Sequence, residues 1–186
     1  MESAASTYTR TAVTLHWLTA VLIVAGFAIG LYAVDLKLSP TKLKLYAWHK
    51  WIGVTVFALA IARLAWRWRH PAPPLPVAMA RWERLAAHGT HAALYALLLA
   101  LPVTGWLMSS ASGVPVVYFG VWPLPDLVAK DKALADALKL VHYALNKTLA
   151  ALVVLHAGAA LKHHFIDRDN VLRRMLRWQA PKQGDA

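Results

Sequence analysis

The chain has 186 residues, enough for one domain, and 59% of them are hydrophobic, above the roughly 45–50% of a typical soluble domain. It contains no cysteine, which excludes disulfides, thiolate-bound zinc, iron–sulfur clusters and covalently attached c-type haem. In a soluble protein the formal net charge of +11 would suggest nucleic acid. With so apolar a composition we expect anionic lipid as the partner instead, and no nucleic acid.

The apolar residues fall into four blocks, each long enough to cross a bilayer, which takes roughly 20 apolar residues. The blocks cover residues 11–34, 45–68, 87–109 and 138–165. A short polar link follows the first block, a loop rich in proline and arginine follows the second, and a linker containing three prolines follows the third. A basic tail, residues 166–186, closes the chain. The sequence therefore predicts an all-α integral membrane bundle of four helices that forms a single domain over residues 1–186.

The distribution of arginine predicts the orientation of this bundle. With the N-terminus inside, every arginine falls on the inner side, whereas most lysines fall in the segments on the outer side. Inner loops of membrane proteins carry an excess of positive charge. We therefore expect both termini in the cytoplasm and the chain in a bacterial inner membrane.

Histidine stands out within the blocks, because an ionisable side chain inside a membrane helix is costly and points to function. His142 and His156 lie 14 residues apart in the fourth block. At about 100° per residue this is roughly 1400°, within about 40° of four whole turns, so both rings face the same way, about 21 Å apart along the helix. This spacing suits two haems stacked across one bilayer.

Each haem then needs a second axial ligand at the same depth from another helix. His49, near the start of the second block, lies level with His142, and His16, near the start of the first block, lies level with His156. We therefore predict two b-type haems whose iron is bound by the pairs His49/His142 and His16/His156. Ligation by two histidines fills both axial positions, which favours electron transfer over gas binding.

Further histidines leave alternatives open at the inner level. His91, which with His88 begins the third block, could replace His16 as the partner of His156. Otherwise these two rings would bind a propionate, a quinone or a backbone carbonyl. His164 points away from the stripe of haem-facing residues and is expected at the interface.

Two more side chains lie close to the haem-facing stripes. His163 follows His156 by seven residues, about 20° off the same stripe and about 10 Å further inward. That is too close for a third haem but suits a hydrogen bond to a substrate. Arg63 lies 14 residues after His49 and would face the inner haem, where it could pair with a propionate or a quinone oxygen. Snorkelling to the headgroups explains Arg63 equally well.

Motifs along the chain resemble the bacterial cytochrome b561 family over nearly its whole length. They are YTRTAVTLHWL, HKWIG, RLAWRWRHPAPP, LAAHGTHAALYALLLALPVTG, LVHYAL and LHAGAALKHHFIDRDNVLRRM. The resemblance implies a four-helix bundle with two b haems. It places the four paired histidines, His16, His49, His142 and His156, at the family's ligand positions.

The resemblance also implies candidates for substrate binding. The family includes a superoxide oxidase, which takes electrons from superoxide at the periplasmic face and reduces ubiquinone. His163 and Thr14 match positions linked to quinone binding, and Thr14 keeps the hydroxyl of the serine that can stand there. The family also contains uncharacterised members and cytochrome subunits of larger complexes, so the resemblance supports the haem more strongly than the substrate.

The preferred hypothesis is a superoxide:ubiquinone oxidoreductase. Lys42, Lys44 and Lys50 cluster near the outer haem, and a positive field of this kind can raise encounter rates with a small anion by about 10-fold or more. Lysines near headgroups also commonly do no more than anchor a helix. The alternative is an electron carrier or cytochrome subunit that links the quinone pool to a periplasmic or dehydrogenase partner. A third hypothesis is a non-redox membrane protein whose histidines pack or bind a metal.

Overall fold

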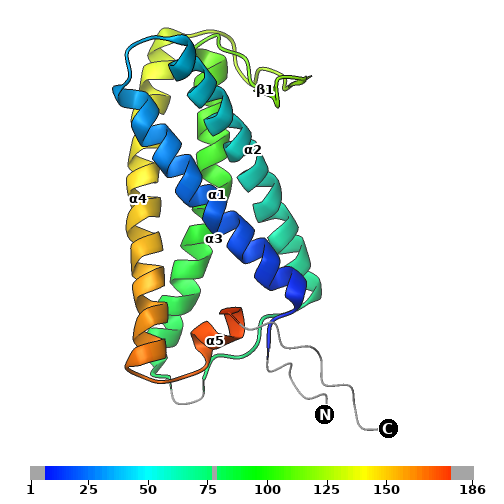
Figure 1. Ribbon diagram of the computed structural model, residues 1–186, viewed down its shortest axis with the longest axis vertical. Coiled ribbons are helices and arrows are strands. Elements are labelled where there is room, and N and C mark those ends of the chain that lie inside the picture. The colour runs from blue at the N-terminus through cyan, green and yellow to red at the C-terminus, as the bar shows by residue number, and fades with distance from the viewer. Residues whose placement is uncertain (1–6, 77–78, 177–186) are drawn as a thin grey trace.

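The computed structural model describes residues 7–76 and 79–176, and it is a bundle of four long helices with two small additions (Figure 1). The long helices are α1 (Arg10–Asp35), α2 (Pro40–Arg69), α3 (Arg81–Ala111) and α4 (Lys132–Phe165). The additions are the hairpin of β1 (Val117–Tyr118) and β2 (Trp122–Pro123), and a short α5 (Val171–Leu176). All four long helices are long and apolar enough to cross a membrane. The predicted all-α four-helix membrane bundle is confirmed.

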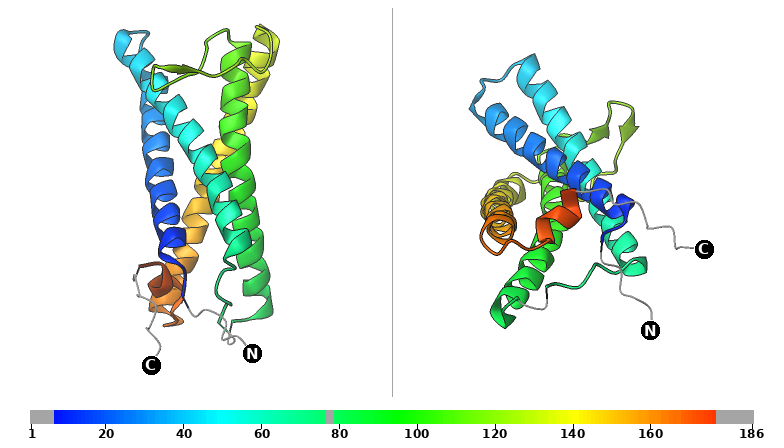
Figure 2. Two further views of the ribbon diagram at one scale, coloured as in Figure 1. Left: turned by 90° about the vertical axis from the view of Figure 1, so that its right-hand side faces the viewer. Right: turned by 60° about the horizontal axis from the view of Figure 1, so that its bottom comes forward.

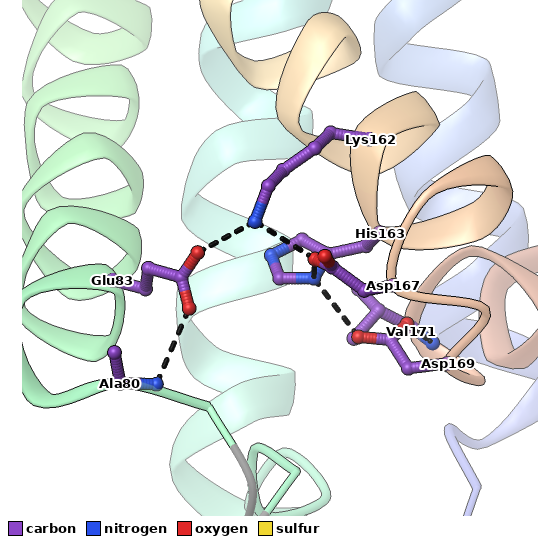
Figure 3. A network of polar contacts seen from close by, with 7 residues as sticks. All are labelled: Ala80, Glu83, Lys162, His163, Asp167, Asp169 and Val171. Atoms are coloured by element: carbon purple, nitrogen blue, oxygen red, sulfur yellow. Dashed lines mark hydrogen bonds and ion pairs between the residues drawn. The ribbon is translucent and has the colours of Figure 1, made fainter.

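Three of the helices begin earlier than their apolar blocks predict, at Pro40, Arg81 and Lys132 instead of at residues 45, 87 and 138. Side chains that satisfy the free N–H groups of a first turn explain these starts. Ser39 accepts from the backbone N–H of Lys42, and Asp131 accepts from that of Leu134. In α3 the Glu83 carboxylate accepts from the Ala80 N–H (Figure 3). The polar first turns extend each helix past its apolar stretch.

The helices run alternately up and down, so that each end of the bundle collects fixed sets of residues (Figures 1 and 2). We call one end the arginine end: it holds the starts of α1 and α3, the ends of α2 and α4, and α5. The other end, with the β1–β2 hairpin, is the hairpin end. The described arginines lie toward the arginine end, as their distribution in the sequence predicts; Arg177 and Lys182 lie outside the described residues.

The helices pack as two antiparallel pairs, α1 with α2 and α3 with α4, joined mainly through α2 and α3. One core cluster contains Val56, Ala60 and Leu98, and another contains Leu97, Leu101 and Leu149. Large apolar side chains also cover the outside, for example Val24 on α1 and Val154 on α4. An apolar exterior around a small core is what a bilayer solvent favours.

The C-terminal part of the chain folds back across the arginine end (Figure 2). The Trp17 indole N–H donates to the Met175 carbonyl at 2.8 Å, and Arg174 donates to the Pro74 carbonyl at 2.8 Å. The predicted basic tail therefore contains a short helix, α5, that docks on α1 and on the loop between α2 and α3. Residues 177–186 of that tail lie outside the described residues.

Candidate functional site

The histidine pair nearest the hairpin end joins α2 to α4. The centroids of the His49 and His142 rings are 6.4 Å apart. Nδ1 of His49 lies 3.0 Å from the Gly26 carbonyl oxygen of α1. Because a carbonyl can only accept, Nδ1 carries the hydrogen, and Nε2 is left with a free lone pair.

A hydroxyl orients the second ring of this pair in the same way. Nδ1 of His142 lies 3.0 Å from Oγ1 of Thr104 on α3. That hydroxyl already donates its hydrogen to the Leu101 carbonyl at 2.8 Å, so it accepts from Nδ1. Nε2 of His142 is therefore also free to bind a metal, with a hydrogen-bonded partner behind the ring, which is the usual support of a ligating histidine.

Two glycines give these rings their space. A Cβ at Gly30 would lie 3.0 Å from Cε1 of His49, and a Cβ at Gly105 would lie 3.2 Å from Cε1 of His142. Any larger residue would push against the ring. At Gly53, which also lines the space beside this pair, an added Cβ would meet nothing within 4 Å.

A cavity lies beside this pair and is lined by both rings. Its walls are mostly apolar, with Gly53, Leu98 and Val116 among them. Among the described residues, Lys50 is the one lysine in the lining. An apolar lining with a few polar groups is typical of a site for an apolar cofactor or ligand.

The second pair lies toward the arginine end. The His16 and His156 ring centroids are 6.2 Å apart. Nη2 of Arg63 lies 3.1 Å from Nδ1 of His16. Because a guanidinium can only donate, Nδ1 of His16 accepts this hydrogen bond, unlike Nδ1 of His49 and of His142. Arg63 in turn lies over the Tyr95 ring at 5.3 Å. The prediction that Arg63 faces the inner pair agrees with this placement.

Both pairs have the spacing that bis-histidine ligation requires. Two imidazole nitrogens bound about 2 Å from one metal place the ring centroids roughly 6 Å apart, and the measured values are 6.4 and 6.2 Å. His91 lies nearer to His156, with centroids 5.2 Å apart, which is too short for a metal between the rings. The residues therefore fit a haem at each pair, and of the two alternatives the geometry favours His16 over His91.

Comparison with known proteins shows the family of the chain. Residues 7–178 match the family model described as prokaryotic cytochrome b561. A protein of Escherichia coli named cytochrome b561 homolog 2 is 40% identical over 87% of the chain and 86% of its own length. Cytochrome b561 homolog 1 of the same organism is 30% identical, over 91% of the chain and 96% of its length. A Yersinia pestis protein named probable superoxide oxidase CybB is 29% identical, over 87% of the chain and 91% of its own length.

The chain belongs to the prokaryotic cytochrome b561 family. It is accordingly a multi-pass bacterial membrane protein that binds b-type haem and transfers electrons.

His163, a predicted quinone-binding residue, sits in a polar cluster at the end of α4 (Figure 3). Its Nδ1 lies 3.0 Å from a carboxylate oxygen of Asp167 and 2.9 Å from one of Asp169. Lys162 bridges Asp167 at 2.9 Å and Glu83 of α3 at 2.6 Å. His163, Asp167 and Asp169 are close enough to hold a metal ion, but the Lys162 ammonium already contacts the same Asp167 oxygen. The two carboxylates lie at ion-pair distance from Nδ1 of His163, which makes no hydrogen bond within the described residues.

Sequence reasoning missed both aspartates of this cluster. Asp167 is four residues after His163, a spacing that brings side chains together at a helix end and so could have indicated the contact. Asp169 reaches the ring because its backbone N–H donates to the His163 carbonyl at 3.0 Å, after Arg168 turns the chain with a φ of 52°. No pattern in the sequence predicts that turn.

The other predicted residues near the arginine end are more exposed. Thr14 is exposed on α1, and within the described residues no hydrogen bond or ion pair joins it to His163 or Arg63. His88 is exposed at the start of α3. His164 packs against Phe165, with ring centroids 4.8 Å apart. His163 and Arg63, by contrast, lie beside charged and aromatic side chains.

A tyrosine that sequence reasoning did not single out also lies at this end. Tyr8 precedes α1, and burial raises the pKa of its phenol above the ordinary value, against the opposing effect of Arg67 and Arg174. It therefore stays neutral near these cations at physiological pH.

The three lysines predicted to steer superoxide lie at the hairpin end but have different partners. Lys42 donates to the carbonyls that follow α1, including that of Leu36 at 2.6 Å. Lys44 lies over the Trp48 ring at 5.0 Å. Lys50 donates to the carbonyls of residues 114 and 115 at 3.2 and 3.3 Å, and it alone of the three lines the cavity at His49.

Proposed function

We propose that this cytochrome b561 oxidises superoxide at the hairpin end and reduces ubiquinone at the arginine end. The observation that carries the proposal is the lysine beside the outer histidine pair: Lys50 follows His49 directly and lines the same cavity. The Yersinia pestis relative named probable superoxide oxidase supports this choice of substrate. The positive-inside rule places the arginine end in the cytoplasm and the hairpin end in the periplasm.

Four histidines would hold two haems, His49 with His142 and His16 with His156. When bound, such haems accept and release single electrons without an open coordination position for an oxygen species. Superoxide therefore has no metal site to bind. What the protein offers it is a positive surface near the outer pair.

Lys50 supplies the fixed part of that surface. Its ammonium is held by the two carbonyls of residues 114 and 115, so the charge stays at the wall of the cavity. Lys42 and Lys44 add positive charge at the same end. A concentrated field of this sign attracts a small anion and increases its rate of encounter.

The arginine end supplies groups for a quinone. The overall reaction is 2 superoxide + quinone + 2 H⁺ → 2 O₂ + quinol, so two protons must enter where the quinone is reduced. With Asp167 and Asp169 beside Nδ1 of His163, Nε2 is the nitrogen left for a quinone oxygen. Arg63 is a second candidate donor to the quinone. Thr14 remains a candidate through the family resemblance.

A second candidate function is that of an electron carrier, since the two relatives that share 40% and 30% identity are named only as cytochrome b561 homologs, without a substrate. The same histidine pairs would serve an electron carrier between the quinone pool and a protein partner at the hairpin end. In that case Lys50 would contribute to docking of the partner.

Stopped-flow mixing of the purified holoprotein with superoxide tests the proposal. We expect haem reduction by superoxide, and superoxide consumption above the spontaneous rate when ubiquinone is present. Lys50→Gln should lower the second-order rate constant about 10-fold at low salt and weaken its salt dependence, while Lys50→Arg should retain both.

The matched control for Lys50 is Lys132→Gln. Lys132 lies at the same end but is paired with Asp136 at 2.6 Å, so its removal should leave the rate nearly unchanged. Superoxide consumption no faster than the spontaneous rate would rule the oxidase out. Haem reduction by quinol without any response to superoxide would favour the carrier.

A further inference from the structure

The linker between α3 and α4 exposes an apolar hairpin. No charged residue occurs from Gly113 to Pro125. Around its turn, Phe119 is 61% exposed, Val121 82% and Trp122 72%. Soluble surfaces rarely leave such side chains together without a partner.

The turn itself is well defined. The N–H of Gly120 donates to the Val117 carbonyl at 3.2 Å, and that of Val121 donates to the Tyr118 carbonyl at 3.1 Å. Gly120 has a φ of 73°, and Phe119 has a φ of 51°, a region that an aromatic residue rarely adopts. The backbone thus holds the apolar tip in one arrangement.

The hairpin is fastened to the side of α2 by two hydrogen bonds. The Trp51 indole N–H donates to the Val117 carbonyl at 2.7 Å, and the Tyr118 hydroxyl bonds Oγ1 of Thr55 at 2.9 Å. Thr55 lies six residues further along α2 than His49, about 9 Å toward the arginine end. From there the hairpin projects sideways past α2 instead of continuing the bundle axis (Figures 1 and 2).

We propose that the hairpin tip inserts into the lipid leaflet at the hairpin end, at the boundary between headgroups and acyl chains. Aromatic side chains are enriched at that depth, where an apolar ring and a polar edge both find partners. A segment that projects sideways from a membrane-spanning helix meets lipid before it meets water. The tip also lacks the charged residues that a protein partner would use for specificity.

This anchor bears directly on the outer histidine pair. Val116, one residue before β1, is buried in the wall of the cavity beside His49. Lys50 holds the carbonyls of residues 114 and 115 on the same segment. The lipid leaflet would therefore hold the hairpin tip, while residues 114–116 of the same segment form part of the cavity wall. This holds whichever electron donor the protein uses.

The absence of native cysteine makes a direct test possible. A nitroxide attached to Val121→Cys in the reconstituted holoprotein, in bilayers of phosphatidylethanolamine and phosphatidylglycerol, reports whether oxygen or a water-soluble nickel complex reaches it more often. Val24→Cys, on the apolar exterior of α1, is the lipid reference, and Asp136→Cys, exposed at the hairpin end of α4, is the water reference.

We expect position 121 to behave like position 24, with oxygen favoured over the nickel complex. Behaviour like position 136 would overturn the proposal, because the tip would then be in water. Low accessibility to both reagents would also overturn it, in favour of a protein contact. Spin–spin broadening in that case would identify a second copy of the chain.

A second variant tests the consequence for the loop. Replacing Phe119, Val121 and Trp122 by serine removes the apolar tip but keeps Tyr118 as a chymotrypsin site. With haem content unchanged as the control for folding, we expect cleavage after Tyr118 in reconstituted membranes to increase several-fold. Unchanged protection would show that lipid does not hold the segment.

Discussion

The two histidine pairs hold their rings at nearly equal separations, but the atoms behind the rings differ. At the hairpin end, Nδ1 of His49 and Nδ1 of His142 both donate, to a carbonyl and to a hydroxyl. At the arginine end, Nδ1 of His16 accepts from Arg63. The outer pair thus has a free lone pair on each Nε2 before any metal binds, whereas His16 has its hydrogen on Nε2 in the arrangement observed.

This difference has a chemical consequence for Arg63. When a neutral imidazole binds iron through Nε2, its hydrogen lies on Nδ1, and that nitrogen can no longer accept from a guanidinium. Arg63 must then release His16 and turn to another acceptor, such as a carboxylate or a carbonyl oxygen. At His49 and His142 the hydrogen bonds already suit metal ligation. At His16, haem binding would free the Arg63 guanidinium for a propionate or a substrate.

The largest effects should follow removal of the ligands themselves. We expect His142→Ala to lose the outer haem and His156→Ala to lose the inner one, so that each variant retains about half of the haem per chain, because a haem with one axial histidine is held weakly. Haem quantitation on the purified variants, with the optical spectrum of the remaining haem, measures this.

His91→Ala is the matched control for the inner pair, since its ring lies 5.2 Å from His156 but outside the proposed ligand set. It should keep the full haem content, while His16→Ala should lose the inner haem. The reverse result would assign the ligand to His91. Full pigment in both His142→Ala and His156→Ala would contradict the whole arrangement.

A smaller effect should follow from removing the support behind one outer ring. Thr104→Val is nearly isosteric and deletes the oxygen that accepts from Nδ1 of His142. Loss of such a partner typically lowers metal affinity about 10- to 100-fold, so we expect the outer haem to dissociate at least about 10-fold faster while the inner haem is unaffected. Transfer of haem to an apo-acceptor protein measures the two rates.

Thr148→Val serves as the control for the hydroxyl. Thr148 is exposed on α4 and donates to the Ala144 carbonyl of its own helix at 3.0 Å, with no ring nearby. If both variants release haem at the same rate, the contact of Thr104 with His142 has no role in ligation.

The pairing in depth of His49 with His142 and of His16 with His156 could be predicted from the sequence, because helix depth depends only on residue spacing and on the direction of each span. The same argument placed Arg63 near the inner pair. The helix starts could not be read from the apolar blocks, since the first turns at Pro40, Arg81 and Lys132 are polar and extend beyond the hydrocarbon.

Contacts that depend on how one helix is rotated against another were beyond sequence reasoning. The Gly26 carbonyl and the Thr104 hydroxyl reach the rings only because α1 and α3 face the His49 and His142 side chains with those residues. The hairpin was missed for another reason. Its strands are only two residues long, and its fixed position comes from the contacts of Trp51 and Thr55 on α2, which lie far away in the sequence.

The smallest expected effect concerns the charge that distinguishes the inner pair. Arg63→Leu removes a positive charge close to His16, and the reduced, less positive form of the inner haem should become less stable. A unit charge at this range in partly screened surroundings changes the energy by roughly 1 kcal/mol, so we expect the inner midpoint potential to fall by on the order of 40 mV and the outer one to change much less. Arg63→Lys keeps the charge and should restore most of the potential, although it cannot reproduce a bidentate contact. Redox titration followed in the optical spectrum measures both potentials. Equal shifts at the two haems, or a fall of the same size in Arg63→Lys, would mean that Arg63 acts through packing, and the electrostatic contrast between the two pairs would be lost.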